Sequence, residues 1–195
     1  MLLVMPDGTK ACGTEVVLHA CCAPCSAAII ESMLQNGMNP IVFFSNPNIY
    51  PLQEYEIRKE ELKRFLRALD IPFYEDDYDY DVWLEEMTGL ESEPERGRRC
   101  SRCFLLRLNR TASFAESHHV RWFTTTLSSS RWKDYNQIVA AGNQAARNHE
   151  GLDFWPQNWR KGGLQQRRAE LLRENNFYNQ LYCGCEFSLR SREQK

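Results

Sequence analysis

The sequence contains no long hydrophobic run. No segment approaches the roughly 20 consecutive apolar residues that a membrane-spanning helix needs, and residues 1–14 lack the basic segment and apolar run of a secretory signal. The chain also lacks internal repeats, low-complexity tracts and a clear linker. These absences predict a cytoplasmic protein with no membrane partner, in which residues 1–14 form an extension and residues 15–195 form a single domain.

Net charge is also small, but it is unevenly distributed. The chain has 24 Lys and Arg against 26 Asp and Glu. Residues 121–195 contain twelve of the basic and seven of the acidic residues, whereas residues 1–120 contain twelve basic and nineteen acidic residues. A basic C-terminal third can face a phosphate backbone, although a solvated basic surface has the same composition.

Cysteine, in contrast, is abundant: the 195 residues include eight. The hydrophobic fraction of 43% is that of an ordinary globular protein. In a reducing compartment, clustered cysteines indicate a metal site or catalysis rather than structural disulfides. The cysteines are therefore the first candidates for a functional site.

The hydrophobic pattern predicts alternating strands and helices. Strands are expected at residues 15–19, 39–45, 71–74 and 120–126, and helices at 27–34, 54–69, 82–87, 102–116, 132–147 and 164–175, with a loop over 151–163. This alternation predicts a three-layer α/β/α fold with a mainly parallel sheet. The functional crevice of such a sheet lies at the carboxyl ends of its strands, which is where the first cysteine cluster falls.

Seven cysteines form three clusters, and Cys12 stands apart. The clusters are Cys21, Cys22 and Cys25; Cys100 and Cys103; and Cys183 and Cys185. A C-x-x-C pair at a turn directs two sulfur atoms toward one metal, and four such sulfurs suit zinc or an iron–sulfur cluster. The side chains of the adjacent Cys21 and Cys22 point in different directions, so these two residues can bind two neighbouring metal centres.

Three kinds of site remain open on this pattern. A structural zinc site uses four sulfurs and leaves the others unexplained. A thiol–disulfide oxidoreductase uses Cys22 and Cys25 and leaves Cys100 and Cys103 idle. A catalytic iron–sulfur site, with a second metal or a redox-active pair, uses them all.

At these residues the sequence resembles the QueH family of epoxyqueuosine reductases. The matching stretches are LHACCAPCS (residues 18–26), FFSNPNIYPLQEYEIRKEE (43–61), GRRCSRCFLLRL (97–108), TTLSSSRWKD (125–134) and NQLYCGCEFS (179–188). The joint presence of the three cysteine clusters is specific, whereas each alone is weak. Residues 153–163 look longer or more aromatic than the corresponding family segment.

The resemblance implies a fold similar to the adenine-nucleotide α-hydrolase type and a cobalamin-independent reduction of epoxyqueuosine to queuosine in transfer RNA. It also implies a [4Fe–4S] cluster and a second, mononuclear iron, held collectively by the seven clustered cysteines and served by an unidentified electron donor. We expect Cys22, Cys185 and Asp79 to act at the reacting centre. Asp79 follows the third predicted strand, so it is the candidate carboxylate ligand; its alternative role is a helix cap.

The RNA partner, recognised at its anticodon loop, would need stacking and phosphate contacts. Residues that interleave aromatic rings with positive charge are Trp155, Trp159, Arg160, Lys161, Arg167 and Arg168. A buried aromatic pair beside a solvated basic helix gives the same pattern. His19 is either a proton donor or, the reading we favour, a structural histidine at the end of a buried strand.

Two further classes compete with the reductase. A tRNA sulfur-transfer enzyme would carry a Ser-Gly-Gly-x-Asp-Ser phosphate loop after the first strand, where this chain has HACCAPC. A zinc-stabilised RNA-binding module would hold zinc and show no redox activity.

Overall fold

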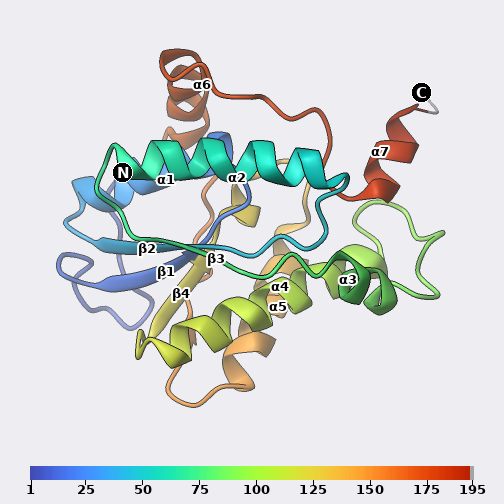
Figure 1. The fold of residues 1–195 in the computed structure, drawn as a ribbon. Coiled ribbons are helices and arrows are strands. Elements are labelled where there is room, and N and C mark those ends of the chain that lie inside the picture. The colour runs from blue at the N-terminus through green and yellow to red at the C-terminus, as the bar shows by residue number, and fades with distance from the viewer. Residues whose placement is uncertain (194–195) are drawn as a thin grey trace.

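Five parallel strands form one sheet in the computed structural model, which describes residues 1–193 (Figure 1). The strands are β1 (Glu15–His19), β2 (Asn39–Phe44), β3 (Phe73–Glu75), β4 (Trp122–Thr125) and β5 (Asp153–Phe154). The helices are α1 (Ala23–Gln35), α2 (Leu52–Arg67), α3 (Tyr80–Glu86), α4 (Arg98–Ser117), α5 (Tyr135–Arg147), α6 (Leu164–Glu174) and α7 (Glu186–Glu193), with a 3-10 helix η1 at Thr126–Ser129. The predicted α/β class is confirmed.

The strand order β3-β2-β1-β4-β5 places β1 at the centre of the sheet. The chain adds β2 and β3 on one side of β1 and then returns to add β4 and β5 on the other. This reversal leaves a crevice beyond the carboxyl ends of β1 and β4, where open α/β sheets bind ligands. His19 and Thr125 are register partners at that edge, so the segments that follow them border the crevice.

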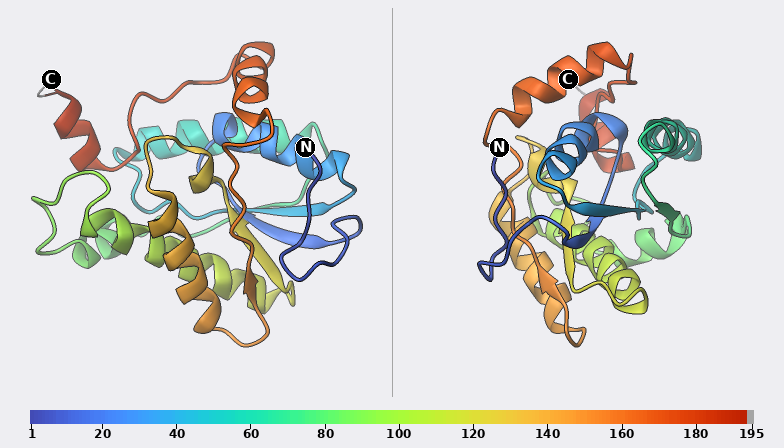
Figure 2. Two further views of the ribbon diagram at one scale, coloured as in Figure 1. Left: turned by 180° about the vertical axis from the view of Figure 1, so that it is seen from behind. Right: turned by 90° about the vertical axis from the view of Figure 1, so that its left-hand side faces the viewer.

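Helices cover both faces of the sheet, as the edge-on view in Figure 2 shows. Helices α1, α2 and α6 lie on one side, and α4 and α5 pack together on the other. Val16 and Leu18 belong to the first core and Val17 to the second, because alternate side chains of a strand point to opposite faces. A strand buried on both faces reads as a continuous apolar run, which is what made β1 recognisable.

A smaller cluster joins the C-terminal tail to the rest of the protein. It contains Trp83 and Met87 near α3, Cys103 on α4 and Phe187 on α7. In Figure 1 the tail leaves α6, runs across the molecule and ends in α7 beside α3. The tail therefore brings Cys183 and Cys185 from the far end of the sequence toward the start of α4.

The structure corrects several predicted boundaries. The predicted 151–163 loop contains the short strand β5, and α7 forms in the tail, where no helix was predicted. Helix α5 begins at Tyr135 rather than at residue 132, because the Asp134 side chain caps it by accepting from the Gln137 amide at 3.0 Å. Helix α1 begins at Ala23 instead of residue 27, with Pro24 in its first turn, where proline is favourable.

Residues 1–14 pack against the main domain. Leu3, Met5 and Ala11 belong to the larger core cluster, and the Leu3 amide donates to Asn36 Oδ1 at 2.9 Å. Among residues 1–193, no helix has the length and apolar character required to cross a membrane.

Candidate metal centre

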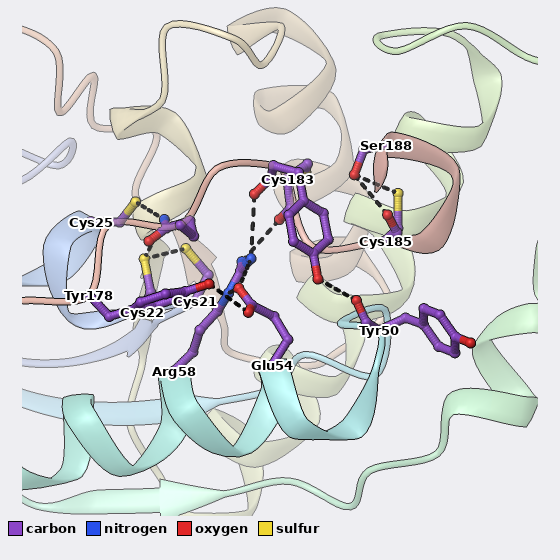
Figure 3. A network of polar contacts seen from close by, with 12 residues as sticks. Cys21, Cys22, Cys25, Tyr50, Glu54, Arg58, Tyr178, Cys183, Cys185 and Ser188 are labelled. Atoms are coloured by element: carbon purple, nitrogen blue, oxygen red, sulfur yellow. Dashed lines mark hydrogen bonds and ion pairs between the residues drawn. The ribbon is translucent and has the colours of Figure 1, made fainter. Parts of the chain in front are cut away.

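The turn from β1 into α1 places three sulfur atoms together. The Sγ atoms of Cys21, Cys22 and Cys25 all lie within 4.8 Å of one another, and Figure 3 shows them side by side at the start of the helix. We call these residues the cysteine triad. Cys22 is the N-cap of α1, so the triad lies beside the free N–H groups and positive dipole end of a helix, which stabilise thiolates.

The triad stabilises one negative charge. Contacts from the Cys22 and Cys25 thiols hold the pKa of Cys21 well below its usual range, and the positive charges of Lys133 and Arg107 act in the same direction against burial. Burial raises the pKa of Cys22, and its contact with Cys21 raises it further. The Gln180 amide donates to Cys22 Sγ at 3.0 Å. The triad therefore favours a thiolate at Cys21, and cysteine sulfur is a donor that fits a soft metal.

The other two clusters also lie at helix starts. Cys100 and Cys103 are in the first turns of α4, and Cys185 immediately precedes α7. Burial raises the pKa of Cys100 to about 11. Burial, together with the negative charge of Cys183, raises the pKa of Cys185 to about 12. These thiols ionise only when a cation compensates for burial, as a bound metal does.

One cavity of about 700 Å³ connects the three clusters. We call it the cysteine cavity. Five cysteines line it: Cys21, Cys25, Cys100, Cys183 and Cys185. Six cationic side chains line it as well, against the single carboxylate of Glu95: Arg58, Arg96, Arg99, Arg131, Lys133 and Arg168. The cavity is suited to anions, whether thiolates, a thiolate-bound cluster or phosphates.

Arg58 fastens the tail over the cavity (Figure 3). Its Nη1 donates to the Cys183 carbonyl at 3.2 Å and its Nη2 to the Tyr182 carbonyl at 3.4 Å. Its Nε and Nη2 donate to Glu54 Oε1 at 2.8 and 2.6 Å. The guanidinium is only 2% exposed. A buried, fully bonded arginine thus joins α2 to the cysteine-bearing tail.

Gly184 permits this close approach. It has φ 127°, a conformation that favours glycine, and a Cβ at this position would lie 3.1 Å from Arg58 Nη1. The Tyr50 amide donates to the Gly184 carbonyl at 2.8 Å. The glycine of the Cys-Gly-Cys sequence therefore lets the tail lie directly on the guanidinium.

His19 is a structural residue, as the sequence favoured. It is fully buried. Its Nδ1 lies 2.7 Å from Thr125 Oγ1 and its Nε2 lies 3.0 Å from the Ser45 carbonyl. Burial, aided by the positive charge of Arg107, lowers the pKa of His19 to about 3. A neutral ring with both nitrogens bonded holds β1 to its neighbours.

Asp79 is not among the residues that line the cysteine cavity. It occupies the N-cap position of α3 without capping it. Its Oδ2 accepts from Arg110 Nη2 at 3.0 Å, and Asp76 shares the same arginine at 3.2 Å. The structure thus shows Asp79 in an ion-pair network with Arg110 and Asp76.

The predicted RNA-binding residues separate into different environments. Trp155 and Trp159 are buried against each other in an edge-to-face pair, so the stacking role proposed for them is wrong and the buried-pair alternative holds. Arg167 is engaged by Glu31, Glu170 and Glu174.

The three remaining cations of this set differ in their access to the cavity. Arg168 lines it. Arg160 is not in the lining, but it donates to the carbonyl of Lys133, which is, at 2.7 Å. Lys161 is exposed and lies outside the lining.

Sequence reasoning missed three residues at the site: Arg58, Lys133 and Gln180. Arg58 and Lys133 stand inside stretches that carry the family resemblance, but no local pattern distinguishes them from surface cations. Burial on its own would lower the pKa of Lys133, yet the negative charges of Cys183, Cys21 and Cys25 outweigh it and raise the pKa. Lys133 therefore keeps its charge between the triad and the tail.

Fold and site together define a class: an α/β protein whose sheet crevice holds a thiolate-rich cavity suited to a metal cluster. A family model described as epoxyqueuosine reductase QueH matches residues 16–191. The chain belongs to the QueH family.

Several proteins named epoxyqueuosine reductase QueH are similar to this chain. One from Haemophilus influenzae is 46% identical over 188 residues, which are 96% of this chain and 75% of the relative. One from Acinetobacter baylyi is 44% identical, over 96% of this chain and 84% of the relative's length. One from Thermotoga maritima is 33% identical, over 92% of this chain and 93% of the relative's length.

Proposed function

We propose that the protein is an epoxyqueuosine reductase that acts on transfer RNA in the cytoplasm. The observation that carries the proposal is the gathering of the cysteine clusters at one cavity, in a chain 46% identical to a protein of that name. Reduction of an epoxide to an alkene breaks both C–O bonds, forms the C=C bond, consumes two electrons and two protons, and releases the oxygen as water. An external electron donor is therefore a required partner.

The donor set fits the iron–sulfur group that the family implies. Three sulfurs lie within 4.8 Å of one another, and the remaining clustered cysteines approach from α4 and the tail. When bound, a [4Fe–4S] cluster supplies single electrons. We propose that the seven cysteines hold this cluster and a second iron, with Cys21 and Cys22 directed to neighbouring centres, and that Cys22 and Cys185 lie at the reacting centre.

Residues of the chain itself prepare the cavity for this chemistry. Lys133 and Arg58 offset the negative charge of thiolates, and the Gln180 amide donates to the Cys22 sulfur. Charge and hydrogen bonds at cysteine sulfur shift the reduction potential of a cluster. The same cations attract the anionic backbone of an RNA substrate.

The test of the function is metal and sulfide analysis on protein purified without oxygen, followed by a reductase assay. A cluster plus one iron gives about five irons and four sulfides per chain. Nucleoside mass spectrometry of epoxyqueuosine-containing tRNA should then show queuosine. One zinc without sulfide contradicts the proposal and favours the zinc RNA-binding module. Metal-free thiol redox activity favours the disulfide oxidoreductase, and a thiolated nucleoside favours sulfur transfer.

The role of Asp79 as a carboxylate ligand of the second iron stays a prediction. Asp79→Asn should lose about one iron per chain and most activity, since an amide is a poorer ligand for iron than a carboxylate. Asp76→Asn is the matched control, because it also removes a carboxylate from Arg110. If both variants keep full iron and full activity, Asp79 serves the ion pair alone.

A further inference from the structure

Trp132 differs from the other tryptophans of the chain. It is 65% exposed, whereas Trp83, Trp122, Trp155 and Trp159 are buried. It also lines the cysteine cavity. A single exposed apolar side chain is common on protein surfaces, but this ring also borders a cavity lined by cations, and tryptophan is enriched where proteins bind their partners.

The backbone beneath this ring is fixed in place. Arg96 Nε donates to the Trp132 carbonyl at 2.8 Å, and Arg96 Nη2 donates to the Arg131 carbonyl at 3.3 Å. The Arg96 amide in turn donates to Cys100 Sγ at 3.3 Å. The Arg131 guanidinium lies 4.7 Å from the centre of the Trp132 ring. Arg96 therefore links the segment that bears this ring to the cysteine-bearing start of α4.

Positive charge surrounds the ring. Arg96, Arg131, Lys133 and Arg168 line the same cavity, and within the described part of the chain none of the four has a carboxylate at ion-pair distance. Arg167, one residue from Arg168, contrasts with them because three glutamates engage it. Arg131 and Arg168 are therefore available to an anionic ligand, whereas the Arg96 guanidinium is bonded to backbone carbonyls and Lys133 balances the charge of the thiolates.

We propose that Trp132 stacks on an unpaired RNA base next to the modified nucleoside, while Arg131 and Arg168 contact the adjoining phosphates. The proposal rests on the proposed function and adds to it the surface that grips the substrate. An indole beside guanidinium groups is the combination that binds single-stranded nucleic acid, since each base has a face to stack and each link carries a charge. When the neighbouring base stacks on Trp132 at the edge of the cavity, the modified nucleoside can extend into the cavity toward the cysteines.

The binding test uses the metal-loaded protein and a fluorescent anticodon stem-loop that lacks the epoxide, with affinity measured by anisotropy at several salt concentrations. Trp132→Ala should weaken binding about tenfold and leave the salt dependence unchanged. Trp132→Phe should bind within about threefold of wild type, because phenylalanine also stacks. The fluorescence of Trp132 is the part of the wild-type emission that is missing in Trp132→Phe. Binding of the stem-loop should protect this part of the emission from quenching by acrylamide.

The cations have a different expected signature. Arg131→Gln and Arg168→Gln should each weaken binding and lower the slope of log affinity against log salt by about 0.7, the value for one phosphate of a single strand. Arg147→Gln is the control, since Arg147 is exposed in the last turn of α5 and lies outside the cavity lining. It should leave affinity and slope unchanged.

Two results separate failure of this inference from failure of the function. If the wild type reduces epoxyqueuosine in tRNA but Trp132→Ala binds the stem-loop as tightly as the wild type, the stacking role is refuted and the reductase stands. If Trp132→Phe binds as weakly as Trp132→Ala, stacking is likewise refuted. If the wild type neither binds nor reduces tRNA, the proposed function and this inference both fall.

Discussion

Cys22→Ser will fold like the wild type but will not retain its iron. Cys22 is 1% exposed and its sulfur belongs to the triad. Serine offers a hydroxyl in place of a thiolate, and a neutral hydroxyl is a poor ligand for iron. Removing a direct ligand should cost more than the roughly 10- to 100-fold in affinity that loss of an outer hydrogen-bond partner costs. Iron and sulfide analysis after oxygen-free purification measures the loss.

The substitution is mild for the fold, which makes it a clean test. Cys22 is the N-cap of α1, a position where serine is among the preferred residues. The Gln180 amide that donates to the sulfur at 3.0 Å can donate to a hydroxyl oxygen as well. We therefore expect the urea midpoint of the metal-free protein to stay within experimental error of the wild type, so that lost iron reports lost ligation.

Cys12→Ser is the matched control for this variant. Cys12 is exposed and lies outside the cavity lining, so its replacement should leave iron, sulfide and activity unchanged. Equal iron in Cys22→Ser and wild type would contradict the assignment of the triad to the metal. Equal loss in both serine variants would show that the loss is not specific to the triad, and would contradict its assignment to the metal.

Arg58→Met will destabilise the protein and release its tail. Glu54, 7% exposed, would lose the guanidinium that neutralises it, and breaking a buried ion pair by removing one partner costs about 3–5 kcal/mol. The carbonyls of Tyr182 and Cys183 would lose their donors at the same time. Urea unfolding measures the stability, and limited proteolysis around residues 179–185 measures the release.

Two further variants separate charge pairing from packing. The double variant Glu54→Leu with Arg58→Met removes both charges and should recover much of the stability, because apolar residues of similar volume replace buried ion pairs well. It should not restore tail protection, since the tail carbonyls still lack donors. Arg167→Met is the surface control: its three carboxylate partners are partly exposed, so its loss should cost less. Full stability of Arg58→Met would refute the anchoring role.

The cysteine spacing and the alternating apolar runs were enough to predict the fold class and the place of the site. Both depend on local sequence: a strand buried on two faces is an unbroken apolar run, and a C-x-x-C turn joins its sulfurs through two intervening residues. The short β5 and the helix α7 escaped prediction because neither has a strong pattern of its own. Strand β5 spans two residues, and pairing with β4 defines it.

The aromatic and basic residues show what the tertiary structure alone decided. Trp132, Trp155 and Trp159 look alike in sequence, yet packing buries two and leaves the third at the cavity rim. Arg167 and Arg168 are neighbours, yet the helix turns one toward Glu31 and the other toward the cysteines. Which faces of these elements meet depends on how the layers pack, and short-range patterns do not contain that information.

The sequence by itself determined the α/β class and the three cysteine clusters proposed as ligands, because apolar runs and cysteine spacing are properties of adjacent residues. The tertiary structure decided which of the charges and rings surround those sulfurs. Arg58 contacts the carbonyl of Cys183 across 125 residues of chain, and Gln180 contacts Cys22 across 158. Such contacts form only when the tail folds back over α2, and burial of the apolar cores, rather than any local motif, brings them together.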